Sequence, residues 1–198
     1  MSSTGLRALS EVERAQLVPI WKWKTSMFLG SYWSQREEPR EAVAVRVARF
    51  LQSISAQDTA LSIWFMKANT ESAARVPLGL VPTDIALKLK NNRGDIRDEI
   101  IPALGFSLGI WNGGHASFRV RAGVYSPRVG NAAVLSLSGP PPLDASVWKA
   151  VLVAAISSFD PDRAVVTSHE RLKMAGATHP WDVGLFTYER GRDVTEHR

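Results

Sequence analysis

The sequence predicts an α+β fold in which an antiparallel sheet carries its helices mainly on one face. Three observations indicate this class: an amphipathic helix early in the chain, a central run of strand-like segments separated by turns, and a second helical segment after a Gly-Pro-Pro-Pro sequence. No repeat or linker divides the 198 residues. We therefore expect a single domain over 1–198, with a loose N-terminal arm at 1–20 and a flexible tail at 190–198.

The first helix is expected from about Pro39 to Ile54. Its apolar residues recur at the spacing of one helical stripe, which predicts that this stripe is buried against the sheet: Val43, Val47, Phe50, Leu51 and Ile54. Proline suits the first turn of a helix, and the carboxylate of Glu41 is favourable near the positive end of the helix dipole.

Three central strands are expected at 106–111, 117–125 and 132–138. The Asn-Gly-Gly sequence at 112–114 and the turn-rich stretch at 127–131 separate them. This spacing predicts an antiparallel meander, because short turns of this kind join strands that run in opposite directions.

The middle strand of this meander alternates between apolar and charged residues. Phe118, Val120 and Ala122 share one side of it, and Arg119 and Arg121 share the other. The pattern predicts that the apolar side faces the core and that the two arginines face outward.

Shorter elements complete the expected fold. V-P-T-D-I-A-L-K-L-K predicts a second helix capped by Thr83, and a third helix is expected from about Val147 to Ser158, capped by Asp144 or Ser146. Further extended segments are expected at 25–33, 61–66, 164–167 and 183–188.

The composition narrows the classes of function. The chain has no cysteine, which excludes disulfide bonds and cysteine-containing zinc sites and fits a reducing compartment. No run is apolar enough for a membrane span or a signal peptide, so we expect a cytoplasmic protein without a membrane partner. The net charge of +5 suits nucleic acid or an acidic protein partner, but the lysines and arginines are scattered along the chain.

The search for catalytic chemistry finds one motif, the G-F-S-L-G sequence at 105–109, which matches the G-x-S-x-G pattern of serine hydrolases. That pattern requires its serine, here Ser107, at a sharp turn between a strand and a helix, and the sequence continues instead into a turn and a strand. None of the four histidines lies in a motif that would pair with it. The sequence also lacks H-E-x-x-H, phosphate-binding glycine motifs and a (D/E)-x-K nuclease pattern, so we expect no metal, no cofactor and no catalysis.

Several stretches resemble, in the same order, those of the immunity protein 52 family. They cover roughly residues 25–190 and are G-S-Y-W-S-Q-R-E-E at 30–38, L-S-I-W-F at 61–65, L-G-F-S-L-G-I-W-N-G at 104–113, R-A-G-V-Y at 121–125, F-D-P-D-R-A-V-V at 159–166 and V-G-L-F-T-Y at 183–188. The most specific piece is the stretch at 104–113.

The resemblance implies an immunity protein of a bacterial polymorphic toxin system. Such a protein binds and neutralises a cognate toxin effector, here a nuclease of the restriction-endonuclease-like class delivered by type VI secretion in interbacterial competition. It would act by blocking a site, with no small-molecule substrate. The basic composition disfavours DNA mimicry and predicts an acidic surface on the toxin.

Four residues are candidates for contact with such a partner. Arg119 and Arg121 come first, because arginine pairs carboxylates in a bidentate fork, and Arg36 and Trp33 are weaker candidates. Trp33 also ends an apolar run, which predicts a place in the core or at its edge. Two other readings stay open: a basic module that binds nucleic acid, and a small hydrolase that uses Ser107.

Overall fold

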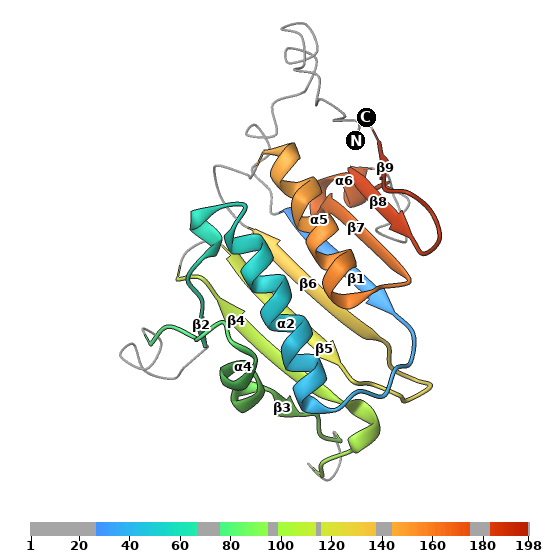
Figure 1. Ribbon diagram of the computed structural model, residues 1–198. Helices are drawn as coiled ribbons and strands as arrows, with labels where there is room; N and C mark the ends of the chain where they lie inside the picture. The colour runs from blue at the N-terminus through green and yellow to red at the C-terminus, as the bar shows by residue number, and fades with distance from the viewer. Residues whose placement is uncertain are drawn as a thin grey trace, which may run out of the picture.

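Figure 1 shows the computed structural model of the chain, which describes residues 27–66, 76–94, 99–113, 116–137, 144–174 and 183–197. A nine-stranded sheet runs through these residues in the order β2-β4-β5-β6-β1-β7-β8-β9, with β3 also paired to β4. The strands are β1 (Met27–Trp33), β2 (Phe65–Met66), β3 (Lys90–Asn91), β4 (Phe106–Trp111), β5 (Ala116–Ala122), β6 (Asn131–Leu137), β7 (Arg163–Ser168), β8 (Phe186–Glu189) and β9 (Thr195–Glu196). Every pairing is antiparallel.

Strand β1 lies inside the sheet and joins its two halves, because it pairs with β6 on one side and with β7 on the other. Helix α2 (Arg40–Ser55) follows β1. Helix α5 (Ala145–Phe159) connects β6 to β7, which lie on either side of β1 in the sheet. Both helices lie over the same face of the sheet (Figure 1). The structure therefore has the predicted α+β fold, with helices mainly on one face. Two shorter helices are α4 (Pro82–Lys88) and α6 (His169–Met174).

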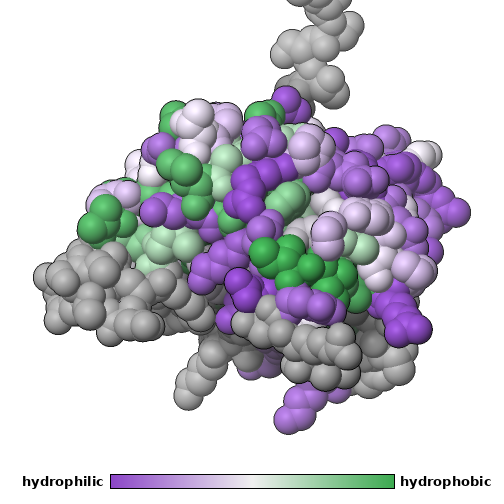
Figure 2. Space-filling view, turned by 90° about the horizontal axis from the view of Figure 1, so that it is seen from below, coloured by the Kyte–Doolittle hydropathy of each residue, from purple (hydrophilic) through white to green (hydrophobic). Residues whose placement is uncertain are grey.

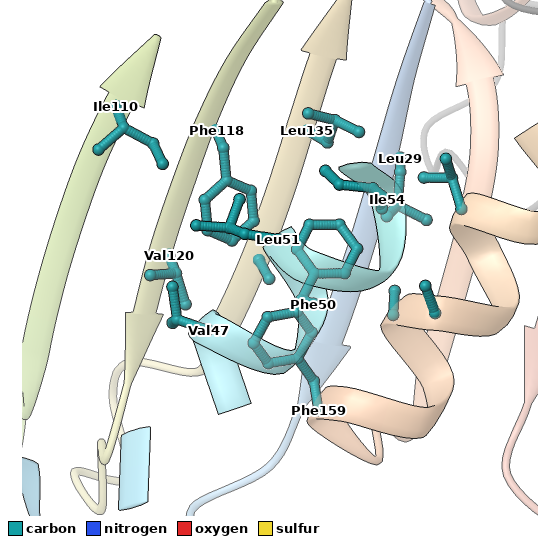
Figure 3. Close-up of a cluster of buried hydrophobic side chains, with 14 of the residues drawn as sticks. Leu29, Val47, Phe50, Leu51, Ile54, Ile110, Phe118, Val120, Leu135 and Phe159 are labelled. Atoms are coloured by element: carbon teal, nitrogen blue, oxygen red, sulfur yellow. The ribbon is translucent and has the colours of Figure 1, made fainter. Parts of the chain in front are cut away.

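The core lies between this face of the sheet and the two long helices. The predicted stripe of α2 is completely buried, since Val43, Val47, Phe50, Leu51 and Ile54 are each 0% exposed. Figure 3 shows four of these side chains, Val47, Phe50, Leu51 and Ile54, facing those of β5, β6 and β1, with Phe159 of α5 beside them. Phe50 packs against Phe118 and Phe159 with ring centroids 5.1 and 5.3 Å apart.

Two local predictions are wrong, each for a physical reason. The segment 61–66 is not a continuous strand: a 3₁₀ turn over Thr59–Leu61 precedes it, and only Phe65–Met66 pair with β4. The cap of α4 is Val81 rather than Thr83. Pro82 fixes the backbone of the first helical position, which places Thr83 inside the first turn.

The sequence predicts that two terminal segments, an N-terminal arm and a C-terminal tail, lie outside the packed fold. The expected arm at 1–20 lies outside the described residues. In the expected tail at 190–198, Thr195–Glu196 form β9, which pairs with Phe186 and Thr187 of β8.

Candidate functional site on the open face of the sheet

The sheet has one face that α2 and α5 do not cover, which we call the open face. Side chains alternate between the two faces along each strand, so the register shows which residues share the open face. In β4, β5, β6 and β1 they are Ser107, Gly109, Trp111, Ser117, Arg119, Arg121, Ala132, Val134, Ser136, Phe28, Gly30 and Tyr32. Glycine, alanine and serine make up much of this set, so the face is shallow between its few long side chains.

Arg119 projects from the middle of the open face, and Arg121 projects from it near the end of β5. Both are exposed, and within the described part of the chain neither forms a hydrogen bond, an ion pair or a ring contact. Their partners on β4 are Gly109 and Ser107, whose small side chains do not cover the guanidinium groups. Lys90 of β3 is exposed on the other side of Ser107 and adds a third cation. The predicted outward orientation of the two arginines is confirmed.

A shallow cavity, which we call the dent, lies at the end of the open face where β1 ends and β6 begins. It has a volume of about 330 Å³ and is lined by Tyr32, Trp33, Arg121, Gly130, Asn131, Ala132, Asp162 and Arg163. Arg121 therefore belongs both to the open face and to the wall of the dent. Arg163, at the far side, pairs with Glu189 at 3.1 Å.

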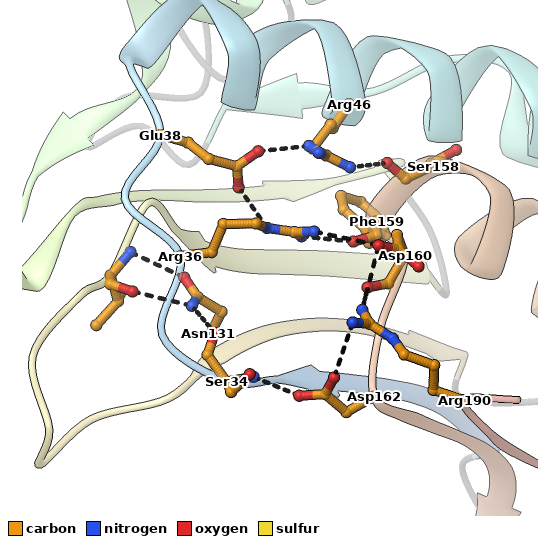
Figure 4. A network of polar contacts seen from close by, with 11 residues as sticks. Ser34, Arg36, Glu38, Arg46, Asn131, Ser158, Phe159, Asp160, Asp162 and Arg190 are labelled. Atoms are coloured by element: carbon orange, nitrogen blue, oxygen red, sulfur yellow. Dashed lines mark hydrogen bonds and ion pairs between the residues drawn. The ribbon is translucent and has the colours of Figure 1, made fainter.

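Arg36 lies in a network of polar contacts where β1 leads into α2 (Figure 4). The buried Glu38 accepts hydrogen bonds from Arg36 Nε at 3.1 Å and from Arg46 Nε at 2.6 Å. The same arginines donate to the last carbonyls of α5, at Phe159 (2.6 Å) and Ser158 (3.1 Å). Such carbonyls lack partners inside the helix and carry partial negative charge, so cations placed there stabilise the end of α5.

The network continues through the turn between α5 and β7. Asp160 ends α5 in the left-handed conformation, with φ of 47°, which aspartate adopts more readily than most residues. Arg190 Nη2 lies 3.2 Å from Asp160 Oδ2, and its Nη1 lies 3.4 Å from Asp162 Oδ1. Asp162 Oδ2 also accepts a hydrogen bond from the Ser34 amide at 2.7 Å. We call the six charged residues of this network the polar joint: Arg36, Glu38, Arg46, Asp160, Asp162 and Arg190.

The surroundings shift the pKa of two groups in the polar joint. Burial raises the pKa of Asp162, but the amide of Ser34 and the positive charges of Arg190 and Arg36 outweigh burial, so this pKa lies below its ordinary value. Burial lowers the pKa of Arg36, and the charge of Glu38 opposes this effect. Both groups remain charged near neutral pH, as their ion pairs require.

The two weaker candidates of the sequence are therefore held inside the fold. Trp33 is 4% exposed and stacks on Phe159 with ring centroids 5.5 Å apart, which confirms its predicted place in the core. The guanidinium of Arg36 lies 5.5 Å from the centroid of the Trp33 ring while it bonds Glu38. In this conformation neither residue offers a partner the kind of exposed surface that Arg119 and Arg121 offer.

Ser107 lies within β4, where it pairs with Lys90 and Arg121. It is therefore not at a strand-to-helix turn, and its hydroxyl has no hydrogen-bonding partner among the described residues. The geometry of a nucleophile elbow is absent at this serine. In the described ranges, no group of three or more histidine, aspartate or glutamate side chains could hold a metal ion.

Exposed apolar residues lie elsewhere, around α4. Val81 and Leu87 are 48% and 80% exposed, and Val76, just upstream, is 67% exposed. Figure 2 looks at the molecule from below: hydrophilic residues predominate on the side of β8, whereas apolar residues are interspersed on the side of α4. Nothing in this surface indicates the chemistry of a partner, whereas the unpaired arginines of the open face do.

A comparison with protein families places this geometry in a biological context. The sequence profile described as immunity protein 52 matches residues 25–189. The chain belongs to the immunity protein 52 family. The match spans the open face and every residue of the polar joint except Arg190. Membership of this family implies an immunity protein with a toxin as its partner. A search of curated proteins finds no match.

The structure also brings together residues that the family resemblance singled out separately. Trp33, Arg36 and Glu38 come from the stretch at 30–38, and Phe159 comes from the stretch at 159–166. They meet in and around the polar joint, so these two stretches are in contact in the folded chain. Within the described residues, no helix has the length and apolar character needed to cross a membrane.

The sequence did not single out the other residues of the dent, such as Tyr32, Ala132 and Arg163. They come from three strands that are far apart in the chain, and only the pairing of β1 with both β6 and β7 places them side by side. The alternation within each strand would have assigned their faces, but it carries no signal for which strands are neighbours.

Proposed function

We propose that this protein neutralises a nuclease toxin of the restriction-endonuclease-like class by covering its active-site cleft with the open face, without any catalysis of its own. The observation that carries the proposal is the pair Arg119 and Arg121, exposed and unpaired among small side chains in a member of an immunity protein family. A nuclease of that class concentrates carboxylates in its cleft to hold metal ions. Guanidinium groups bind carboxylates through two parallel hydrogen bonds, which gives both attraction and orientation.

The shape of the open face supports the same contact. The open-face residues of β4, β5 and β6 are all at least partly exposed, so this part of the sheet is available to a partner, whereas Phe28 of β1 is 6% exposed. Glycine, alanine and serine around the arginines let a partner approach the sheet closely, so that the arginines reach beyond the surface into a concave site. In this proposal Arg36 and Trp33 act indirectly, by fixing the turn that borders the dent.

The proposal also places the protein in the cytoplasm of the producing bacterium and its kin, where a toxin delivered by type VI secretion would meet DNA. The affinity should be high, because an immunity protein must hold its toxin at low concentration. A dissociation constant of about 1 nM corresponds to roughly −12 kcal/mol. Interfaces of that strength commonly bury about 1,600 Å² in total.

The experiment is to purify this protein with the toxin domain encoded beside it and to follow cleavage of plasmid DNA. We expect a complex on size-exclusion chromatography and complete inhibition at an equimolar ratio, because a blocking protein acts stoichiometrically. Complete inhibition of the toxin by much less than one equivalent of this protein would indicate that the protein acts as a catalyst. The absence of a complex and of protection would overturn the proposal.

The cations of the open face also favour a second candidate function, binding to a nucleic-acid backbone. Lys90, Arg119 and Arg121 would contact phosphates, and the affinity would then fall with salt at a slope set by about three contacts. Fluorescence anisotropy with duplex and single-stranded DNA across a salt series tests this function. Binding that is tighter to DNA than to the toxin would favour it over toxin neutralisation.

A further inference from the structure

The dent has a definite place in the register of the sheet. One cross-strand row of the open face runs through β5, β6, β1 and β7, and its members are Arg121, Ala132, Tyr32 and Arg163. Neighbouring strands lie about 4.8 Å apart, so the backbones of the two arginines are separated by roughly 14 Å. Two cations thus stand at the ends of a short row whose middle contains a methyl group and an aromatic ring.

The floor of the dent is empty because its side chains are small or turned away. Ala132 and Gly130 fill little space, and the ring of Tyr32 lies back along its own strand over Gly30. A Cβ atom at Gly30 would lie only 2.6 Å from the Tyr32 hydroxyl oxygen, so glycine at this position makes room for the ring. The remaining volume of about 330 Å³ is enough for one side chain of a partner.

The charges around the dent are unevenly satisfied. Asp162 is already bound to the Ser34 amide at 2.7 Å and lies 3.4 Å from Arg190, and Arg163 pairs with Glu189 at 3.1 Å. Arg121 has no such partner among the described residues. The uncompensated charge in the wall of the dent is therefore positive.

We propose that the dent is the binding site for one acidic side chain of the toxin, a glutamate or an aspartate that inserts between Arg121 and Arg163. The aliphatic stem of this side chain would pack on Ala132 and Gly130, and its carboxylate would bond the guanidinium of Arg121. This inference rests on the proposed function and goes further, because it assigns one contact to one site. It also distinguishes Arg121, which holds an inserted group, from Arg119, which projects toward the partner.

The test measures the affinity of the same toxin domain by isothermal titration calorimetry for four proteins. Ala132→Leu fills the dent without changing any charge, and Arg121→Gln removes the charge without filling the dent. Arg49→Gln is the matched control, because Arg49 is exposed on α2 at the opposite face of the sheet. We expect Ala132→Leu and Arg121→Gln each to weaken binding at least about tenfold, with wild-type affinity for Arg49→Gln. Only Arg121→Gln should also flatten the salt dependence of binding.

The outcomes separate the two claims. A toxin that does not bind the wild-type protein refutes the proposed function, and the inference with it. A toxin that binds the wild type and Ala132→Leu equally well refutes the inference alone, because nothing then enters the dent. The thermal midpoint of each variant is measured first, and Ala132→Glu, which places a carboxylate in the same space, replaces Ala132→Leu if the latter unfolds. A charge swap completes the test: toxin variants with lysine at a contacting acidic residue should restore binding to Arg121→Glu.

Discussion

The polar joint and the open face treat their arginines in opposite ways. In the polar joint, Arg36 and Arg46 are half-buried, share the carboxylate of Glu38 and bond the last carbonyls of α5. On the open face, Arg119 and Arg121 are exposed and have no bonding partner in the described part of the protein. The same residue type is used for cohesion at one place and is left available at the other.

This difference indicates that the polar joint stabilises the fold and that the open face is the better candidate for binding a partner. The polar joint contains the residues through which two family stretches meet, and it ties the segments that flank β1, α5 and β8. Its interactions are complete within the chain, so it needs no partner to explain them. The open face leaves the charges of Arg119 and Arg121 exposed and without a bonding partner among the described residues, which is the condition expected of a surface that a partner later covers. Variants of the two regions should therefore separate stability from binding.

The largest effect is expected from Glu38→Ala in the polar joint. Removing this carboxylate, which is 8% exposed, leaves the half-buried Arg36 and Arg46 without their shared partner. Breaking a fully buried ion pair costs at least about 3 kcal/mol, so we expect a loss of up to about 3 kcal/mol here. Urea unfolding at neutral pH measures the loss. The exposed neighbour Glu37 supplies the control, since Glu37→Ala should change the free energy of unfolding by less than about 0.5 kcal/mol.

Glu38→Ala should leave toxin affinity within about threefold of the wild type while the protein stays folded, because Glu38 is buried and lies outside the proposed interface. A tenfold change in affinity would correspond to about 1.4 kcal/mol. A variant of normal stability would show that the joint is not a stabilising contact. A variant that is folded and yet no longer binds would move the joint into the interface and erase the contrast between the two regions.

The next effect is expected from the double reversal Arg119→Glu with Arg121→Glu on the open face. Carboxylates facing the acidic cleft of a toxin repel it, so affinity should fall at least 100-fold, or about 2.7 kcal/mol, and the association rate should lose its salt dependence. The thermal midpoint should stay near that of the wild type. Calorimetry and stopped-flow binding across a salt series measure these quantities.

The matched control reverses two exposed cations on the helix-covered side, Arg49→Glu with Lys149→Glu, and so makes the same change in net charge. If both double variants lose affinity equally, the effect comes from total charge and not from the open face. If neither loses affinity, the arginines lie outside the interface and its location must be sought elsewhere, for instance around α4.

A smaller effect concerns pH and Asp162. The folded-state pKa of this carboxyl lies below its ordinary value of 3.8, so its contribution to stability is complete above that value and is lost as the pH falls through the folded-state pKa. Asp162→Asn should therefore lower the free energy of unfolding at neutral pH by less than about 1 kcal/mol, because the carboxyl is 39% exposed and solvent screens its ion pairs. The difference from the wild type should shrink as the pH falls below the ordinary value of 3.8, and a difference that does not shrink with falling pH would contradict the assignment.

Local patterns were enough to predict a large part of the fold. The buried stripe of α2 and the alternating burial in β5 are both confirmed. Each is a property of a single segment, because an element that packs one side against the core must repeat its apolar residues with its own helical or strand period. The errors arose where two local signals compete. In α4 the proline at the first helical position overrode the threonine beside it, and the apolar run at 61–66 divided between a 3₁₀ turn and a two-residue strand.

The candidate site could be predicted only in part, because it has one local and one non-local component. The outward orientation of Arg119 and Arg121 follows from alternation within β5 alone. The dent depends on β1 lying between β6 and β7, a pairing between strands about 100 residues or more apart in the chain. The polar joint likewise requires Arg36 and Asp160, which are far apart in the sequence, to lie close together in the fold. No pattern of spacing along the sequence predicts this proximity.

The smallest effect is expected from Ser107→Ala, which also tests the remaining hydrolase hypothesis. Ser107 is half-buried within β4 on the open face, has no bonded base among the described residues and lies beside Arg121. Stability should change by less than about 0.5 kcal/mol, and protection of DNA from the toxin should remain complete at an equimolar ratio. Ser117→Ala, two residues before Arg119 on the same face, is the control for any effect of removing a hydroxyl from the proposed interface. A variant that still binds the toxin but no longer protects DNA would make Ser107 a catalytic residue and would end the account of inhibition by blocking. Full protection by the variant would leave the open face acting through its arginines.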